Sequence, residues 1–284
     1  MNTKKLSVKV YKRQKKTDVL GLAKEMLKDL FGSHFLALQF AKRDISAQYR
    51  QSYLGILWMF ITPVATAAIW IFLNNSGTVV IADTGMPYPV YVFSGTLIWS
   101  IILDAINSPT QSTNANRSIL SKINFPKEAL ILSGIYKLLF NSSIKIIILL
   151  AFIVIYGVGF HWSLLLFPLF LLFSVLIGSA IGLFLTPIAL LYSDVSRLVT
   201  MLLSLIMYLT PVVYGIPESG IMKKLMVYNP FTAMVTTVRA AAVGQDIPYL
   251  NYFLLLTGGG LILVLFSLII FRISIPIIIE RLSA

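Results

Sequence analysis

Long apolar stretches alternate with short polar ones along most of the chain. Six of them, at about 17 residues or more, are long enough to cross the hydrocarbon core of a bilayer as a helix. They cover residues 53–73, 88–108, 130–158, 162–191, 198–214 and 249–271. The alternation of apolar and polar positions that marks a membrane β-barrel is nearly lacking. The pattern therefore predicts an all-α membrane protein with about six transmembrane helices.

The residues before the first apolar stretch have a different pattern. Residues 1–17 are basic and polar, and "VLGLAKEMLKDLFGS" follows with apolar and charged side chains on opposite helical faces. The second segment is too charged to span, so we expect an amphipathic helix at the membrane interface that is C-capped by Gly32. The alternative is a soluble helix packed on a partner. We divide the chain into a basic cytoplasmic leader (1–17), the interfacial helix with a gate segment (18–52) and a transmembrane domain (53–284).

The stretch from 215 to 248 does not fit a simple six-span pattern. Its apolar pieces are short and are interrupted by Pro217, Gly220 and Pro230. Such pieces suit short re-entrant or interfacial helices in the last outer loop better than full spans. The alternative, a seventh span, would place the C-terminus on the other side of the membrane.

Composition supports an integral membrane protein and explains its charge. Hydrophobic residues make up 57% of the chain and charged residues only 12%, yet the formal net charge is +12. The basic residues concentrate ahead of the first span, where anionic lipid and the positive-inside rule account for them without nucleic acid. That group comprises Lys4, Lys5, Lys9, Lys12, Arg13, Lys15, Lys16, Lys24, Lys28, Lys42, Arg43 and Arg50.

The loops predict the orientation. "NRSILSKINFPKE" and "SDVSR" carry Lys or Arg, whereas "NNSGTVVIADTGMP" and "GVGFHW" carry neither. By the positive-inside rule the first two loops are cytoplasmic. We expect a multi-pass protein of the cytoplasmic membrane with both termini in the cytoplasm.

Several kinds of chemistry lack the residues they need. The chain has no cysteine and no Gly-rich loop ending in Lys-Ser or Lys-Thr, and His34 and His161 lie far apart in sequence. We therefore expect no metal site and no nucleotide bound by this chain itself. A multispan membrane enzyme, such as a glycan polymerase, would need acid, base or nucleophile residues gathered at one place, and Asp104 with the two histidines offers no such group.

The spans contain a few side chains suited to binding. Lys137 and Lys145 lie two turns apart, so both could face a hydrated path and attract an anionic substrate; alternatively Lys137 reaches the surface and Lys145 bonds a polar neighbour. Aromatic rings can stack on sugar rings, although interfacial belts and core packing explain most of them. The candidates are Trp58, Phe60, Trp70, Trp99, Tyr208 and Tyr214.

Four motifs resemble one family: the membrane permeases of ABC transporters that export polysaccharide such as O-antigen, capsule or teichoic acid. The motifs are "RDISAQYRQSYLGILWMFITP", "NRSILSKINFPKEAL", "LYSDVSRLVTMLLSLIMYLTPVVY" and "YNPFTAMVTTVRAAAVG", in the family's order. The chain departs from the pattern at Ser193, where the family often has Arg before Asp-Val.

The resemblance implies a homodimer of six-span subunits. Two copies of a cytoplasmic ABC ATPase subunit would use ATP and Mg, and the cargo would be a lipid-linked polysaccharide. The rivals are a permease of the same class for a lipid or drug and, less favoured, the multispan enzyme.

Within this resemblance we assign roles to two segments. The seam that enters the first span would hold the lipid pyrophosphate and first sugars at the cytoplasmic mouth; the alternative is a polar anchor that fixes the depth of the span. Its residues are Arg43, Tyr49, Arg50, Gln51, Ser52, Tyr53 and Gly55. Coupling to the ATPase would use the polar segment between spans two and three, at Arg117, Ser118, Leu120, Lys122 and Phe125.

Overall fold

The computed structural model describes residues 19–50, 52–78, 84–120, 122–123 and 125–283, and these form helices and turns with no β-strand among them. The all-α prediction is confirmed. The helices are α1 (Val19–Gly32), α2 (His34–Arg50), η1 (Gly55–Leu57), α3 (Trp58–Asn75), α4 (Tyr88–Ala115), α5 (Arg117–Leu120), α6 (Glu128–Ile155), η2 (Trp162–Leu165), α7 (Phe167–Leu191), α8 (Ser193–Tyr208), α9 (Gly220–Tyr228), α10 (Pro230–Val243) and α11 (Leu250–Ser283). The leader, residues 1–17, lies outside the described residues.

Five helical segments among the described residues are long and apolar enough to span a membrane. They are η1 with α3, then α4, α6, α7 and α11. The fifth predicted span, 198–214, is instead a helix of 16 residues, α8, followed by an irregular turn. At 1.5 Å per residue α8 is about 24 Å long, less than the hydrocarbon core of about 30 Å.

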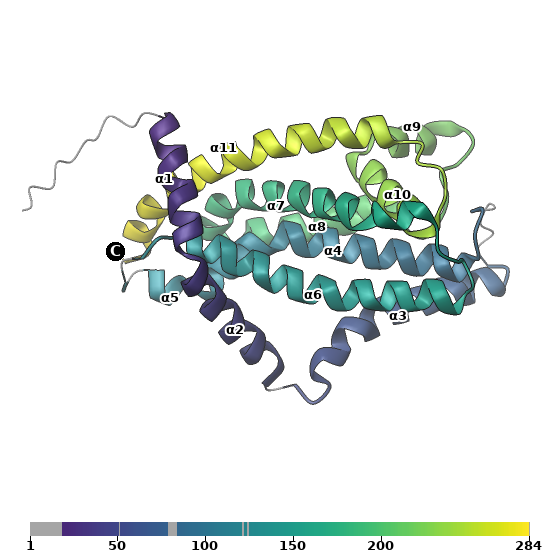
Figure 1. Cartoon of the computed structure of the whole chain (residues 1–284), viewed down its shortest axis with the longest axis horizontal. Helices are drawn as coiled ribbons and strands as arrows, with labels where there is room; N and C mark the ends of the chain where they lie inside the picture. Colours follow the sequence, from purple (N-terminus) through teal and green to yellow (C-terminus); the bar gives the residue numbers. More distant parts are fainter. Residues whose placement is uncertain (1–18, 51, 79–83, 121, 124, 284) are drawn as a thin grey trace, which may run out of the picture.

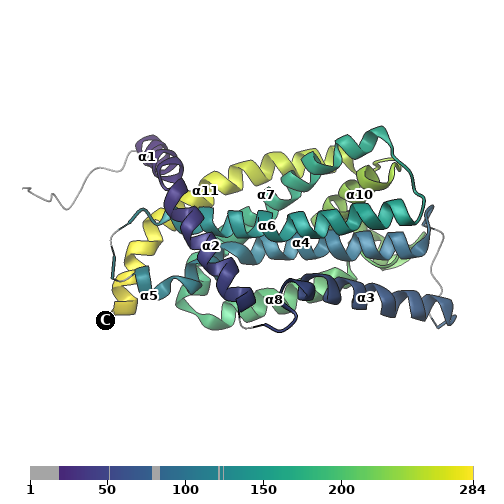
Figure 2. The same cartoon turned by 60° about the horizontal axis from the view of Figure 1, so that its bottom comes forward.

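The long helices run side by side, and the short ones gather at the two ends of the bundle (Figure 1). Helices α1 and α5 lie at the end where α11 finishes, and α9 and α10 lie at the opposite end. We call these the α5 end and the α10 end. The view turned by 60° again shows α1 and α5 at one end of the bundle and α10 at the other (Figure 2).

Helix α4 is the central element of the bundle. In its most apolar 18-residue stretch 78% of the residues are buried, compared with 11% for α3. Gly178 and Gly182 bring α7 against α4, since a Cβ on Gly182 would lie 1.9 Å from the carbonyl oxygen of Ile106. These glycines therefore serve packing inside the subunit.

Buried side chains explain why α8 ends at Tyr208. The Arg239 guanidinium on α10 donates to the carbonyls of Pro211 (2.9 Å) and Val212 (2.7 Å) and lies 3.8 Å from the centre of the Tyr91 ring. Because Pro211 has no N–H to continue a helix, these carbonyls need partners from elsewhere. The turn after α8 is thus bonded to α4 and α10.

The predicted short helices of the last outer loop are α9 and α10. Asn229 caps α10, its side-chain oxygen accepting from the N–H of Phe231, and Gly244 ends the helix in a left-handed conformation (φ 77°). Most of α10 is buried against α4, α7 and α11. Arg239, a basic residue in this predicted outer loop, is buried and bonds the turn after α8.

Helix α1 packs on the bundle through charge as well as apolar contact. Met26 is buried, and Arg272 of α11 forms ion pairs with Asp29 (2.8 Å) and Glu25 (3.7 Å) of α1 and with Glu128 (2.7 Å) of α6. The acidic side chains of α1, which we predicted on the charged face of an interfacial helix, therefore bind the helix bundle. The predicted Gly32 cap is wrong: Gly32 has no positive φ, and the Ser33 N–H bonds back to the Asp29 carbonyl, so helical bonding continues past Gly32.

Candidate functional site

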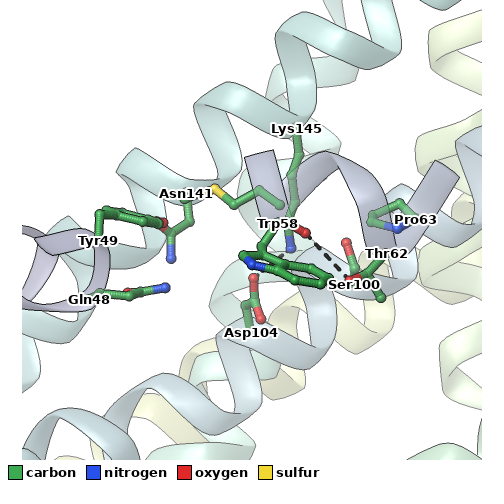
Figure 3. A pocket seen from close by; sticks show the side chains of 10 residues that line it. Gln48, Tyr49, Trp58, Thr62, Pro63, Ser100, Asp104, Asn141 and Lys145 are labelled. Atoms are coloured by element: carbon green, nitrogen blue, oxygen red, sulfur yellow. Dashed lines mark hydrogen bonds and ion pairs between the residues drawn. The ribbon is translucent and has the colours of Figure 1, made fainter. Parts of the chain in front are cut away.

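A polar pocket of about 340 Å³ lies between α2, α3, α4 and α6 (Figure 3). It is lined by Gln48, Tyr49, Trp58, Met59, Thr62, Pro63, Ser100, Asp104, Asn141 and Lys145. Only two of these ten, Lys145 and Pro63, are buried residues. Such a gathering of hydrogen-bonding groups beside apolar helices is typical of a binding site.

An ion pair lies at the base of the pocket. The Lys145 ammonium of α6 donates to the Asp104 carboxylate of α4 over 2.7 Å; the lysine side chain is 8% exposed and that of the aspartate 43%. Lys145 therefore bonds a polar neighbour, as the second alternative predicted, and it also lines a pocket; attraction of an anionic substrate stays a prediction. The two charges cancel, so the pocket offers one cation and one anion with no net charge.

Two aromatic side chains flank this pair. Trp58, at the start of α3, is 53% exposed and presents its indole to the pocket (Figure 3). Tyr49, near the end of α2, has its hydroxyl 3.5 Å from the Asn141 side-chain oxygen. Burial, with a smaller effect from the Asp104 carboxylate, raises the pKa of Tyr49, so its hydroxyl remains a proton donor.

The turn between α2 and α3 connects two of the helices that line the pocket. The Gly55 N–H donates to the Ser52 hydroxyl over 3.0 Å, and Gly55 takes a left-handed conformation with φ of 48°. A residue with a Cβ is disfavoured in that conformation. Gly55 therefore suits this turn, which lies between Tyr49 and Trp58 in the chain.

The seam residues do not all meet in this pocket. Tyr49 lines it, whereas Arg50 and Tyr53 are exposed and outside its lining, and Gln51 falls outside the described residues. Arg43 lies further back on α2, where it bonds Asp44 (2.6 Å) and the Asn116 side chain (2.5 Å). Phosphate binding by the seam stays a prediction.

The predicted channel residues are dispersed. Besides Trp58 and Lys145, Trp70 faces Tyr214 at 6.4 Å between ring centres, and Trp99 is a core residue that meets Phe231 edge-on at 5.5 Å. Phe60 is half-buried, Tyr208 is exposed, and the Tyr214 hydroxyl donates to the Tyr208 carbonyl. Their role in a channel stays a prediction.

The segment expected to contact an ATPase has a buried and an exposed side. Leu120 at the end of α5 packs in an apolar cluster with α6, α7 and α11, and Phe125 packs edge-on against Phe40 of α2 at 5.7 Å. Arg117, Ser118 and Lys122 are exposed. The segment is therefore anchored to four helices while its charges face outward.

Sequence reasoning gave no role to six of the ten lining residues. Four of them lie within the first quoted motif (Gln48, Met59, Thr62 and Pro63), whereas Ser100 and Asn141 lie in no quoted motif, and only the folded chain brings the six together. Asp104, an acid within an apolar span, was the available signal, since such a residue needs a partner.

Comparison with known proteins places these features in one family. The ABC-2 type transporter family matches residues 36–243, which include the pocket, α5 and α10. The chain belongs to the ABC-2 type transporter family. Similar proteins named O-antigen export system permease protein RfbA occur in Myxococcus xanthus and Klebsiella pneumoniae, each 25% identical. The first comparison covers 78% of this chain and 86% of the relative, the second 84% and 91%. As a member of an ABC-2 family, the chain is a multi-pass transport subunit.

Proposed function

We propose that this chain is the permease that exports a lipid-linked polysaccharide of the O-antigen type across the cytoplasmic membrane. The similarity to two RfbA permeases over more than three quarters of each chain carries this proposal. The α5 end then faces the cytoplasm, in agreement with the basic loops near it. ATP hydrolysis takes place in a separate ATPase subunit.

The exposed faces of α3 and α8 support a dimer with the conduit between two copies. Both helices contact α4, and only Leu203 of α8 is buried. Arg197, Thr200, Ser204 and Tyr208 are exposed at helical spacing along one side of α8. Polar groups on a membrane helix normally face a protein interior or water, so a second copy and an aqueous path account for this stripe better than lipid does.

The pocket lies on the cytoplasmic side of this path. Asn141 is 14 residues from the outer end of α6, which corresponds to about 21 Å of a hydrocarbon core about 30 Å thick. A polymer entering from the cytoplasm would pass the exposed seam and the pocket on its way along α8. Two ATPase subunits, one beneath each α5, would transmit force through the anchored segment 117–127.

Deletion of the gene tests the function. We expect lipid-linked polymer to accumulate inside the cell and surface polymer to disappear, measured by immunoblot of membrane and surface fractions. The wild-type gene should restore the surface polymer. Normal surface polymer in a strain without a second exporter would contradict the proposal, and transport of a fluorescent hydrophobic drug would then favour the lipid or drug alternative.

Single cysteines test the dimer, because the natural chain has none. Ser204→Cys places a thiol within the exposed polar stripe of α8, and Leu265→Cys places one on an exposed position of α11. We expect oxidation to link two chains for Ser204→Cys and not for Leu265→Cys. Equal linking of the two variants would contradict an interface at α8.

A further inference from the structure

The pocket at Asp104 and Lys145 combines two features that rarely occur together inside a membrane protein. It has a charged pair whose lysine is almost fully buried, and it has open polar groups from four helices. Gln48 is exposed, and the Thr62 and Ser100 hydroxyls donate to carbonyls of their own helices, over 3.4 Å to Trp58 and 2.8 Å to Leu97, so that their oxygens can still accept a bond from a ligand. The pocket is thus furnished for a ligand with many hydroxyl groups.

We propose that this pocket binds a neutral sugar unit of the exported polymer, and not the phosphate of its lipid carrier. The proposal rests on the proposed function, because it names the part of that substrate which the pocket receives. Sugar binding is then a role of the pocket and phosphate binding a role of the seam, whereas the sequence predicted both roles for the seam.

Charge decides between sugar and phosphate. The Lys145 cation is already neutralised by Asp104 at 2.7 Å, and the Asp104 carboxylate would repel a phosphate at the same place. A sugar hydroxyl both donates and accepts, so it can bond the carboxylate and the ammonium together. Hydrogen bonds to charged groups are the stronger ones, which suits a site that must recognise uncharged groups.

Shape supports the same choice. A volume of about 340 Å³ is within the usual range for a small-ligand pocket. The Trp58 indole offers an apolar face for the C–H side of a sugar ring, and the side chains of Gln48 and Asn141 offer amide donors and acceptors at its edge. Phosphate recognition has no use for an aromatic face.

The position of Arg50 completes the division of roles. Arg50 follows Tyr49 directly, yet it is exposed and outside the pocket lining. A lipid pyrophosphate held near Arg50 would therefore lie next to the pocket, and the sugars attached to it would lie within reach of Trp58. Pocket residues would then determine which sugar enters the conduit.

Binding measurements on the full-length chain in lipid nanodiscs test the proposal. The probe is the cell's own surface polysaccharide, released from its lipid, shortened to oligosaccharides and labelled at its reducing end for fluorescence polarisation. Trp58→Ala and Asn141→Ala should each weaken binding about tenfold. Trp162→Ala is the matched control, since Trp162 is an exposed tryptophan in the outer η2 turn, and it should bind like the wild type.

Inorganic pyrophosphate is the second probe. It should not displace the oligosaccharide from the wild-type chain, and it should begin to compete in Asp104→Asn, where the Lys145 charge is no longer balanced. Unchanged oligosaccharide affinity in both alanine variants, or displacement by pyrophosphate from the wild type, would overturn the proposal. An absence of binding by the wild type would overturn it as well. The deletion experiment separates this failure from a failure of the proposed function. If deletion removes the surface polymer, the chain is required for export even when the pocket binds no sugar.

Discussion

Replacing Arg239 by methionine tests whether the turn after α8 is held by the buried guanidinium. Methionine approximates the length of the side chain but donates no hydrogen bond. The Pro211 carbonyl would keep a bond from the Tyr91 hydroxyl (3.1 Å), whereas the Val212 carbonyl would lose the Arg239 donor. The substitution therefore removes two hydrogen bonds and one ring contact, and it leaves the Val212 carbonyl without its Arg239 donor.

The magnitude follows from these contacts. Two hydrogen bonds to a charged donor are worth about 1.5–3 kcal/mol each and a desolvated cation–π contact about 2 kcal/mol. Desolvation of the buried guanidinium offsets several kcal/mol of this sum. We expect a net loss of about 2–4 kcal/mol, which corresponds to a fall in melting temperature of about 5–10 °C for a chain of this size.

Thermal unfolding of the detergent-solubilised protein, followed by fluorescence-detected size exclusion, is the assay. Lys223→Met is the control, since Lys223 is exposed on α9 and, among the residues that the structure describes, its ammonium bonds only the Glu218 carbonyl. It should melt within about 1 °C of the wild type. A melting temperature for Arg239→Met equal to that of Lys223→Met would refute the reasoning.

Three further predictions concern packing, coupling and the seam. Gly182→Ala should lower the melting temperature in the same assay because its Cβ would meet the Ile106 backbone, whereas Gly258→Ala, in open space, should not; equal values would contradict the packing argument. Joint charge reversal of the exposed Arg117 and Lys122 should abolish ATPase co-purification and export without changing the melting temperature, and intact co-purification would remove α5 from the docking surface. Arg50→Lys should lower export if the guanidinium binds phosphate bidentately, and full export would favour a simple membrane anchor.

Hydropathy was sufficient for the long helices because the bilayer imposes their length and their apolar character. It was insufficient at α8, where the apolar run continues through Val213 but the helix stops at Tyr208. Pro211 was the local sign of this stop. The side chains that bond the turn, Arg239 and Tyr91, lie 28 and 120 residues away from Pro211, so no local pattern could reveal them.

The site was predictable to a similar degree. Tyr49, Trp58 and Lys145 were proposed from residue type and position, and they line one pocket. Their polar neighbours could not be found in this way, since the helix pairing that joins Asp104 to Lys145 spans 41 residues. The acidic side chains of α1 were also misassigned to the water-facing side, because their partner, Arg272, lies far along the chain.

The most direct test of export is reconstitution of the chain with its ATPase in proteoliposomes. Lipid-linked polysaccharide extracted from the deletion strain would be added to the outside, with the ATPase subunits also facing outside. We predict that ATP moves the polymer into the lumen, where an added glycosidase no longer degrades it, and that no protection develops without ATP. Polymer that stays fully accessible to the glycosidase while ATP is hydrolysed would contradict the account.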